Sequence, residues 1–348
     1  MQLLLVALSP STDASYAPSL SAYLLFTSSH GTTFPPSADM VLAFATFLFH
    51  VQRFHHRKVK RYVTALRSFC AECAADLRPF ECPRLHRLYR GMARWLPGSQ
   101  GQPAPRPRRL PITGPLLARI LGTLSSSTAR ERALAAGVSI GFFGLLRAGE
   151  FAWKGWDARG NKYIILLRRH VTWGERDVSI LLLESKTDHI RQGVRVRIFF
   201  CGGPFCAFTL LRAAWQRAPR QGPDDPLLQV DSRGTPLSYR GLLDFIKKSV
   251  VSFGYPSSVF GTHSLRIGGA SQLAMMGFTE AQIKAAGRWL SDCYLQYVRL
   301  GDDFFQSLAS ALGRSAVATA RPFGILPPLL ASTASSDSVV ALFQPRRG

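Results

Sequence analysis

Residue types that can bind and attack a phosphate lie close together near the C-terminal end of the sequence. Residues 262–270 read Thr-His-Ser-Leu-Arg-Ile-Gly-Gly-Ala, and Gly287-Arg288-Trp289 and Tyr297 follow. His263 and Arg266 are three positions apart, so on a helix they share one face and can both reach one anion. An indole N–H is a further donor, and a tyrosine hydroxyl is a nucleophile. The pattern indicates phosphate chemistry; the alternative is a set of amphipathic helices with a buried histidine.

A helix is expected to carry the histidine and the arginine. Ser264 is its predicted N-cap, and the helix runs to Gly277, where glycine ends it. His263 and Arg266 would then lie at the positive end of the helix dipole, which favours a bound phosphate.

Two further helices are expected to bring the tryptophan and the tyrosine. Thr279 is the predicted cap of the first of them, and Gly287 is its predicted closing residue. The second begins at residue 291 or 292 and carries Tyr294 and Tyr297 on nearly one face. The site is therefore predicted to lie where these three helices meet.

The charge of the chain points to an extended anionic partner. The sequence has 43 Lys and Arg against 21 Asp and Glu, a net charge of +22 over 348 residues. Such an excess is typical of nucleic-acid-binding proteins. Hydrophobic residues make up 47% of the chain, which is ample for folded cores, and the length favours two domains. Disorder does not explain the charge.

The sequence also excludes some classes of protein. It contains no run long enough to span a bilayer. The apolar opening, residues 3–8, lacks a basic stretch before it, so we expect an intracellular protein rather than a secreted one. Cys70 and Cys73, with Cys82 and His86 downstream, have superficial zinc spacing, but they fall in a helical pattern where small buried thiols are common.

Helical periodicity dominates the first hundred residues. We expect helices over residues 13–30, 37–49, 58–75 and 83–95, with Ser37 capping the second; Pro18 favours a late start for the first. The first 110 residues carry 14 Lys and Arg but only 5 Asp and Glu, so this bundle is itself basic. Its predicted DNA-binding residues are Lys58, Lys60, Arg61, Arg67, Arg87 and Arg90.

A proline-rich and arginine-rich stretch separates this bundle from the rest of the chain. Residues 98–111 contain Pro103, Pro105 and Pro107, which favour an extended linker. Arg108 and Arg109 are predicted to contact DNA, because a basic linker suits a protein that closes around a polyanion.

In the rest of the chain, the hydrophobic pattern changes in places from helical spacing to the two-residue alternation of a β-strand. Helices are expected over residues 113–124, 130–143, 205–216 and 239–253, and strands over residues 163–169, 178–184 and 194–200. Lys186 falls at the tip of the hairpin that joins the last two strands. The fold class is therefore mainly α with a small antiparallel β-sheet (α+β).

These motifs resemble the tyrosine recombinase (phage integrase) family. The resemblance rests on residues 145–150 (Leu-Leu-Arg-Ala-Gly-Glu), residues 185–188 (Ser-Lys-Thr-Asp), residues 263–266 (His-Ser-Leu-Arg), Gly287-Arg288-Trp289 and Tyr297, in this order. The residues in these motifs are similar to those of the eukaryotic recombinases of DIRS-type and crypton-type mobile elements. The resemblance covers nearly the whole chain, which implies a helical core-binding (SAM-like) domain followed by a catalytic domain.

The resemblance implies a role for each matched residue. Tyr297 is the nucleophile that leaves a 3′-phosphotyrosine, with Tyr294 as its rival one turn earlier. Arg147 and Arg266 hold the non-bridging phosphate oxygens, a task that suits planar, permanently charged donors. His263 is the accompanying donor or proton-transfer group.

Three further roles follow from the same resemblance. Lys186 is the general acid to the departing 5′-oxygen, although Arg191 or Lys162 substitutes in a relaxed alignment. Trp289 stands where many relatives have histidine. Its indole can donate a hydrogen bond but cannot accept a proton, so its expected role is a phosphate contact or packing against Tyr297. Glu150 is an acid that orients the arginine or the histidine. No metal or other cofactor is expected, because the arginines supply the positive charge.

The predicted domains are residues 9–97 (core-binding, DNA-binding), residues 98–111 (linker), residues 112–312 (catalytic) and residues 313–348 (C-terminal tail). The tail ends in an apolar segment that either docks on a neighbouring protomer or is disordered. The expected partner is double-stranded DNA, bound by a dimer at each site and by a homotetramer on paired sites.

Three functions are compatible with these residues. The first is a site-specific recombinase or integrase of a mobile element, the second a DNA-binding protein of the same fold that has lost its chemistry, and the third a DNA-relaxing enzyme of the topoisomerase IB type. The helical bundle and the short length favour the first. A nuclear location is inferred from the eukaryotic resemblance alone.

Overall fold

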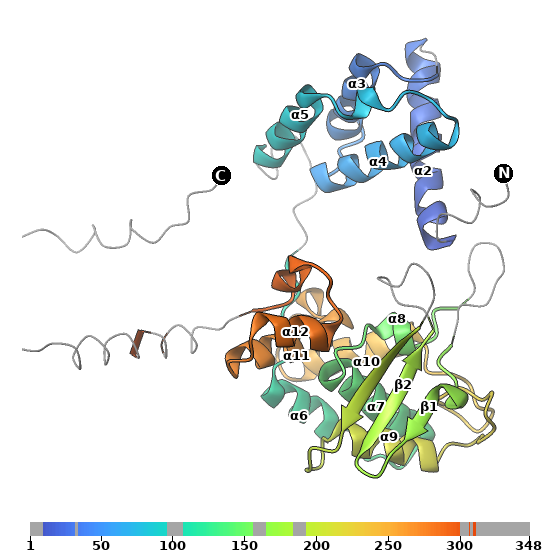
Figure 1. Ribbon diagram of the computed structural model, residues 1–348, viewed down its shortest axis with the longest axis vertical. Coiled ribbons are helices and arrows are strands. Elements are labelled where there is room, and N and C mark those ends of the chain that lie inside the picture. Colours follow the sequence, from blue (N-terminus) through green and yellow to red (C-terminus); the bar gives the residue numbers. More distant parts are fainter. Residues whose placement is uncertain are drawn as a thin grey trace, which may run out of the picture. The chain divides into compact units, whose positions relative to one another are not determined.

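The computed structural model describes residues 10–31, 34–95, 107–155, 165–183 and 193–299, together with Gln306, Ala309 and Ser310. The chain divides into a first unit, Met1–Arg299, and a second, Leu300–Gly348. All helices and strands described below belong to the first unit (Figure 1). The predicted tail, residues 313–348, lies outside the described residues.

The N-terminal bundle consists of helices α2 (Pro10–His30), α3 (Ala38–His50), α4 (His56–Glu72) and α5 (Pro83–Arg94), with a 3-10 turn at Arg78–Phe80. All four helices were predicted. Ser37 caps α3 as expected, since its hydroxyl accepts the Met40 N–H at 3.3 Å. The late start of α2 is wrong: the helix begins at Pro10 and contains Pro18, because a proline removes one backbone bond yet keeps a helical φ.

Aromatic and aliphatic side chains from all four helices form the core of this bundle. Tyr23 and Phe26 of α2 contact Phe44 of α3, with ring centres 5.1 and 5.4 Å apart, respectively. Leu66 and Leu85 bring α4 and α5 into the same cluster. Apolar burial of this kind is the main term that stabilises such a bundle.

Two capped helices open the part of the described chain that follows the bundle. They are α6 (Gly114–Gly122), capped by Thr113, and α7 (Ala129–Phe143), capped by Thr128. In α7 the Thr128 hydroxyl accepts the Glu131 N–H, and the Glu131 carboxylate accepts the Thr128 N–H, both at 3.1 Å. This reciprocal capping box satisfies donors that the helix itself leaves unpaired.

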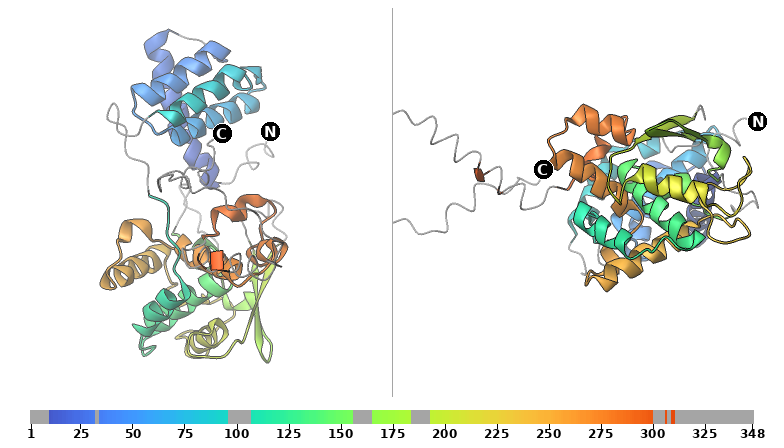
Figure 2. Two further views of the ribbon diagram at one scale, coloured as in Figure 1. Left: turned by 90° about the vertical axis from the view of Figure 1, so that its left-hand side faces the viewer. Right: turned by 90° about the horizontal axis from the view of Figure 1, so that it is seen from below.

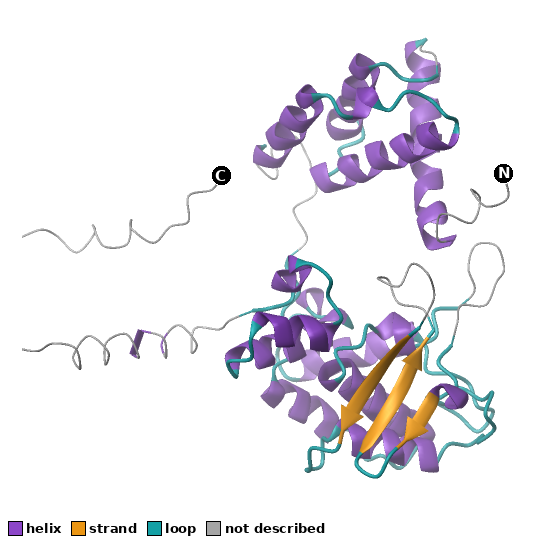
Figure 3. Cartoon of the chain, in the orientation of Figure 1, coloured by secondary structure: helices purple, strands orange, loops and turns teal. Residues whose placement is uncertain are grey.

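A three-stranded antiparallel sheet follows in the described residues, in the order β1 (Val171–Trp173), β2 (Asp177–Leu182), β3 (Val194–Phe199) (Figure 3). The second and third strands are close to their predicted ranges. The first is wrong: residues 165–169 form no strand of this sheet, and residues 163–164 lie outside the described residues. Residues 166–168 pair instead with residues 225–227, through Leu227 N–H to Leu166 O at 2.9 Å and Arg168 N–H to Asp225 O at 3.0 Å.

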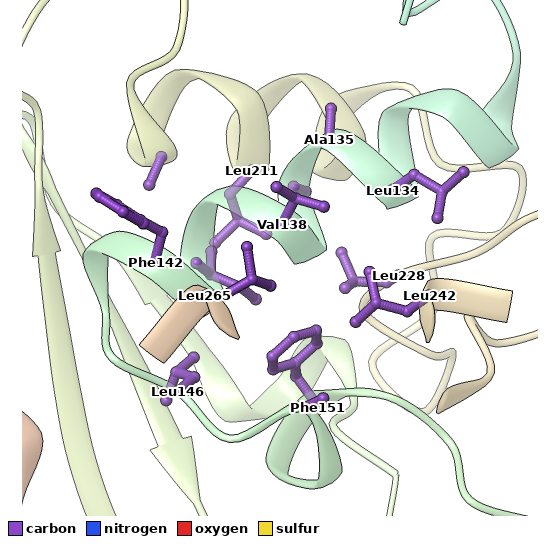
Figure 4. Packing of buried hydrophobic residues seen from close by; sticks show 14 of the residues in the cluster. Leu134, Ala135, Val138, Phe142, Leu146, Phe151, Leu211, Leu228, Leu242 and Leu265 are labelled. Carbon is purple, nitrogen blue, oxygen red and sulfur yellow. The ribbon is translucent and has the colours of Figure 1, made fainter. Parts of the chain in front are cut away.

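One face of this sheet packs against α7 and α9 (Ala207–Gln216), as Figures 1 and 2 show. Alternate β2 residues are buried, among them Val178 and Ile180. Figure 4 shows α7 at the centre of the core, with Val138 between side chains from α9, α10 (Tyr239–Ser252) and α11 (His263–Met275). The helix that carries His263 and Arg266 is thus anchored on the central helix of the core.

Glycines allow α11 to approach its neighbours closely. A Cβ on Gly268 would lie 1.9 Å from the Ile112 carbonyl oxygen, and one on Gly269 would lie 2.3 Å from that of Phe142. No other residue fits such distances. The glycine pair in the sequence motif therefore has a packing role and fixes α11 against the end of α7.

The remaining elements are α12 (Glu280–Gly287) and a 3-10 helix, η4 (Asp292–Gln296). Thr279 caps α12 in a capping box with Gln282, as expected, and Ser291 caps η4. Two expectations are wrong. Ser264 lies inside α11, where it accepts the Gly261 N–H, and the residue that closes α12 in a left-handed conformation is Arg288, not Gly287.

The N-terminal bundle and the larger part after it have separate hydrophobic cores that share no residue. The predicted domain boundaries stay a prediction. Within the described ranges, no helix has the length and apolar character needed to cross a membrane. All six cysteines are free, and the described side chains include no cluster of three or more His, Cys, Asp or Glu with metal-binding geometry.

Candidate active site

Arg147 follows a sharp turn at the end of α7 and is the N-cap of the short helix α8 (Ala148–Phe151). Its backbone N–H donates to Glu150 Oε2 at 2.8 Å, and its Nη1 donates to Glu150 Oε1 at 2.9 Å. The side chain is 16% exposed and that of Glu150 only 5%. Glu150 was expected to orient the arginine or the histidine; it is paired with Arg147 here, and its orienting role stays a prediction.

Glu150 also binds a second arginine. Its Oε2 lies 3.1 Å from Nη2 of Arg288, whose side chain is 11% exposed. Both carboxylate oxygens therefore face guanidinium groups. Burial lowers the pKa of Arg288, and the Glu150 charge opposes that shift. One buried carboxylate thus lies between two arginines that are distant in the sequence.

Arg266 has no exposed surface. Its Nη1 donates to the Leu145 carbonyl and its Nη2 to the Gly287 carbonyl. Burial, and then the charges of Arg147 and Arg288, lower the pKa of Arg266 to about 9. The guanidinium therefore stays charged at neutral pH. Three arginines, Arg147, Arg266 and Arg288, thus lie around a single carboxylate, that of Glu150.

Two aromatic rings cover this guanidinium. The Arg266 Cζ lies 4.5 Å from the centre of the Trp289 ring and 5.3 Å from that of Tyr297, and the two rings are 4.9 Å apart. The predicted packing of Trp289 against Tyr297 is present. Gly287 permits it, since a Cβ there would lie 1.8 Å from the indole ring.

His263 and Tyr297 are neighbours at the edge of the site. The imidazole Nε2 and the phenol oxygen are 3.3 Å apart. His263 is exposed at the first position of α11, whereas Tyr297 is partly buried. We expected His263 and Arg266 to reach one anion together; both contact Tyr297, but only His263 is open to solvent.

Ser271 of α11 positions the backbone around the tyrosine. Its hydroxyl donates to the Tyr297 carbonyl at 3.2 Å and accepts the Arg299 N–H at 2.8 Å. Lys284 of α12 holds the start of η4 through Asp292 Oδ1 at 2.6 Å. Neither role was predicted, because a buried serine and a helical lysine carry no sequence signal of their own.

The rival tyrosine, Tyr294, has a packing role. Its side chain is buried, and its ring centre lies 6.5 Å from that of Trp289. Burial, followed by the nearby Glu280 carboxylate, raises the pKa of Tyr294. Phenolate formation is thus disfavoured there, and Tyr297 remains the tyrosine that contacts both His263 and Arg266.

Three N–H donors in this cluster are buried without a hydrogen-bond partner: Nε of Arg266, Nε of Arg288 and Nε1 of Trp289. An unpaired buried donor costs about 1–3 kcal/mol. The three residues are neighbours, since the Arg266 Cζ lies 4.5 Å from the centre of the Trp289 ring and Arg266 and Arg288 share the Leu145 carbonyl. Unpaired donors on charged groups suit an anionic ligand.

Lys186 lies outside the described residues, as do the alternatives Lys162 and Arg191. The structure therefore brings together Arg147, Glu150, His263, Arg266, Trp289 and Tyr297. Sequence reasoning gave no role to Arg288. The available signal was its position: a residue that follows a helix ending in Gly287 is a candidate for the left-handed closing position.

The predicted DNA-binding residues of the bundle differ in their surroundings. Lys60, Arg61, Arg87 and Arg90 are exposed. Lys58 packs its ammonium 3.2 Å from the centre of the Phe54 ring. Arg67 forms an ion pair with Glu81 at 3.0 Å.

Arg109 is bonded to the end of the segment that leads into α11. Its Nη1 donates to the Ser258 carbonyl at 2.9 Å and also to the Phe260 carbonyl. The neighbouring backbone is tied to the same segment, through Leu110 N–H to Val259 O at 2.8 Å. We call residues 107–112 the strap. Arg108, within the strap, is exposed. Burial lowers the pKa of Arg299, and the charge of Arg108 lowers it further.

No protein-family model and no curated protein sequence matches the chain. Solved structures do match. The XerH site-specific recombinase bound to palindromic difH substrate, in a post-cleavage complex, has a TM-score of 0.54 and 15% identity, over 87% of this chain and 79% of that chain. The Tn1549 transposon integrase in complex with transposon right end DNA has a TM-score of 0.51 and 13% identity, over 81% and 87%.

The Tn1549 integrase in complex with a circular intermediate DNA gives a TM-score of 0.50 at 13% identity, over 79% of this chain and 85% of that one. The chain therefore has the fold of tyrosine recombinases, mainly helical with a small antiparallel sheet. The finer resemblance to DIRS-type and crypton-type elements stays a prediction.

Proposed function

We propose that this protein is a site-specific DNA recombinase or integrase that cleaves and rejoins strands through a 3′-phosphotyrosine on Tyr297. One observation carries the proposal: Tyr297 contacts His263 at 3.3 Å and lies over the buried Arg266, in a chain with the recombinase fold. A nucleophile, a proton-transfer group and a fixed positive charge are together.

In this proposal the scissile phosphate binds beside Arg147 and Arg266. The Tyr297 oxygen attacks phosphorus, its proton leaves through His263, and the bond to the 5′-oxygen breaks. The guanidinium groups and the Trp289 N–H stabilise the charge that builds on the non-bridging oxygens. The unpaired Nε of Arg266 and Nε1 of Trp289 support this, since each can donate to a phosphate oxygen.

Lys186 is proposed as the acid that protonates the departing 5′-hydroxyl. The phosphotyrosine conserves the energy of the broken ester, so another 5′-hydroxyl can attack it in turn without ATP. We propose chemistry without a metal ion because three guanidinium groups already supply the positive charge around the site.

In the described conformation, a phosphate has no access to the Arg266 guanidinium. Arg266 is fully buried beneath Trp289 and Tyr297, so a phosphate reaches it only after the Tyr297 ring moves. The His263 Nε2 and the Tyr297 phenol oxygen are 3.3 Å apart, which is long for a hydrogen bond. Breaking this bond therefore adds little to the free energy of the ring movement. Cleavage should therefore follow a rotation of the Tyr297 side chain on DNA.

Double-stranded DNA is the proposed partner. The net charge of +22 and the exposed basic residues of the bundle favour phosphate binding at many points. The mobile-element role rests on the motifs and on the fold shared with a transposon integrase. A dimer at each site, a homotetramer on paired sites and a nuclear location remain proposals.

A trapped covalent adduct tests the proposal. The wild-type protein and its Tyr297→Phe and Tyr294→Phe variants are incubated with a pool of nicked duplexes of randomised sequence, which lose a short fragment on cleavage and cannot be religated. Denaturing gels then show protein attached to DNA. The expected result is an adduct that only Tyr297→Phe abolishes.

The other outcomes decide between the remaining functions. Salt-sensitive DNA binding without an adduct on any sequence overturns the proposal in favour of a binding protein of the same fold. An adduct lost in Tyr294→Phe instead corrects the nucleophile. Relaxation of supercoiled plasmid without recombinant products indicates the topoisomerase-like alternative.

A further inference from the structure

Arg288 occupies a backbone conformation that ordinarily selects glycine. It closes α12 with φ 56° and ψ 44°. For a residue with a Cβ this left-handed conformation costs about 1–2 kcal/mol, which is why helices usually close on glycine. A strained non-glycine residue in a buried site points to a task for its side chain.

The side chain is 11% exposed and makes three hydrogen bonds. Nη1 donates to the Gly144 carbonyl at 3.3 Å, and Nη2 donates to the Leu145 carbonyl at 3.2 Å and to Glu150 Oε2 at 3.1 Å. Leu145 is itself left-handed, with φ 47°. Arg288 therefore fixes the strained turn that leads into Arg147.

Both proposed phosphate-binding arginines are held by groups that Arg288 also holds. The Leu145 carbonyl accepts from Arg266 as well as from Arg288. Glu150 accepts from Arg147 through Oε1 and from Arg288 through Oε2. No other described residue bonds to both of these shared groups.

This geometry also limits how Glu150 binds Arg147. Oε2 accepts both the Arg147 backbone N–H and Nη2 of Arg288, so its two lone pairs are used and the Arg147 guanidinium makes its one bond to Oε1. Without Arg288, Oε2 keeps the Arg147 backbone N–H but has one lone pair open to a second bond from that guanidinium. A bidentate pair of that kind uses the guanidinium edge that a phosphate needs.

We propose that Arg288 is a positioning residue: it holds Glu150 and the Leu145 carbonyl so that Arg147 and Arg266 keep their donors directed at the scissile phosphate. The inference rests on the proposed strand cleavage. Arg288 itself does not touch the substrate. It fixes the two phosphate-binding arginines relative to each other.

Arg288→Gly isolates the side chain, because glycine suits the left-handed backbone while it removes the guanidinium. Arg288→Lys keeps the charge but not the fork of donors. Ala74→Gly is the matched control, since exposed Ala74 has φ 53° and undergoes the same backbone relief far from the site's residues in sequence. All are compared with wild type by single-turnover adduct formation on the nicked duplex pool.

At saturating DNA, Arg288→Gly is expected to slow adduct formation by about 10- to 100-fold, as misplacement of a binding group does. The Kd for the same DNA is expected to stay within about twofold, because the bundle and other basic residues supply most of the binding. Millimolar guanidinium chloride should partly restore the rate of Arg288→Gly, whereas sodium chloride should not. Arg288→Lys should be slow and unresponsive to guanidinium, and Ala74→Gly should match wild type.

A wild-type rate in Arg288→Gly overturns the inference. So does a slow variant whose melting temperature falls and whose rate guanidinium leaves unchanged, since that outcome shows a structural role only. If wild type forms no adduct, the proposed function fails on its own. The positioning role is then tested by NMR on protein labelled with ¹⁵N-arginine, through the Nε–H resonance of Arg147, which is assigned with the Arg147→Lys variant. Broadening of this resonance in Arg288→Gly supports the inference. An unchanged resonance overturns it.

Discussion

The Arg266 guanidinium lies 5.3 Å from the centre of the Tyr297 ring and has no surface of its own in contact with solvent. The proposed nucleophile thus covers the group that is to bind its target phosphate. Trp289 closes the same space from a second side, at 4.5 Å. Substitutions around this contact therefore separate packing from phosphate binding.

Trp289→Phe keeps an aromatic ring over Arg266 but removes the unpaired N–H donor. If that donor binds a phosphate oxygen, a charged hydrogen bond is lost, and strand cleavage should slow by about 10- to 100-fold. Trp173→Phe is the control, because Trp173 also has a buried Nε1 without a partner but packs on Phe208 and Trp215. Equal cleavage rates in the two variants would contradict a phosphate contact by Trp289.

Gly287→Ala places a Cβ where the structure leaves only 1.8 Å to the Trp289 ring. The ring has to move, which should cost about 1–3 kcal/mol of unfolding free energy and disturb the stack on Arg266. Gly122→Ala, at the end of α6 with nothing within 4 Å, should be neutral or stabilising. Thermal melting of both variants checks the difference, and equal melting temperatures would show that the Trp289 ring is not confined.

Glu131→Gln should make the stability less dependent on pH. Bonds from the Thr128 backbone, and then from the Ser125 and Ser127 hydroxyls, hold the pKa of Glu131 at about 2, below its usual range. The stabilisation it gives is therefore complete above the ordinary carboxyl pKa and is lost as the pH falls from there through about 2. Wild type should melt higher than Glu131→Gln at pH 7, and the two curves should converge on acidification. Exposed Glu72→Gln should show no such convergence.

Arg87→Ala with Arg90→Ala should weaken binding to any duplex. Both side chains are exposed on α5, and neither has an ion-pair partner among the described residues. If each contacts a phosphate, the slope of log K against log salt should fall by about 0.9 per contact. Arg84→Ala on the same helix is the control, because Arg84 is paired with Asp39 at 2.9 Å. An unchanged salt slope would remove α5 from the proposed DNA-binding surface.

Arg109→Ala should mainly lower stability, whereas Arg108→Ala should mainly lower DNA affinity. Arg109 bonds to the Ser258 and Phe260 carbonyls, so its loss should lower the unfolding free energy by about 1 kcal/mol while it changes DNA affinity little. Exposed Arg108 should affect DNA affinity and leave the melting temperature unchanged. Melting curves and Kd values on the same duplex decide; a loss of affinity in Arg109→Ala alone would show that Arg109 leaves the strap to bind DNA.

Local rules were sufficient for most helices. Caps such as Ser37, Thr113 and Thr279 satisfy donors of their own helix, so a few neighbouring residues set the helix start. The expected strand over residues 163–169 failed for the opposite reason. Its alternating pattern is real, but residues 166–168 find their partners near Pro226, some sixty positions away, and no local pattern reveals that pairing.

For the site, residue types were predictable and their environment was not. Residue types and spacing singled out His263, Arg266 and Trp289, and the family resemblance favoured Tyr297 over Tyr294. That Arg266 is wholly buried follows from how α11 packs against the Leu145 turn, which involves residues more than a hundred positions apart. The role of Arg288 depends on the same long-range packing.

The left-handed Arg288 has a consequence for any attempt to engineer this protein. Stability-guided redesign replaces non-glycine residues at left-handed helix ends with glycine, because that change commonly raises the melting temperature. At this position the same rule would remove the residue proposed to align the catalytic arginines. A thermostability screen and an activity screen should thus select different residues here, so Arg288 is a position where foldability and catalytic competence impose conflicting demands.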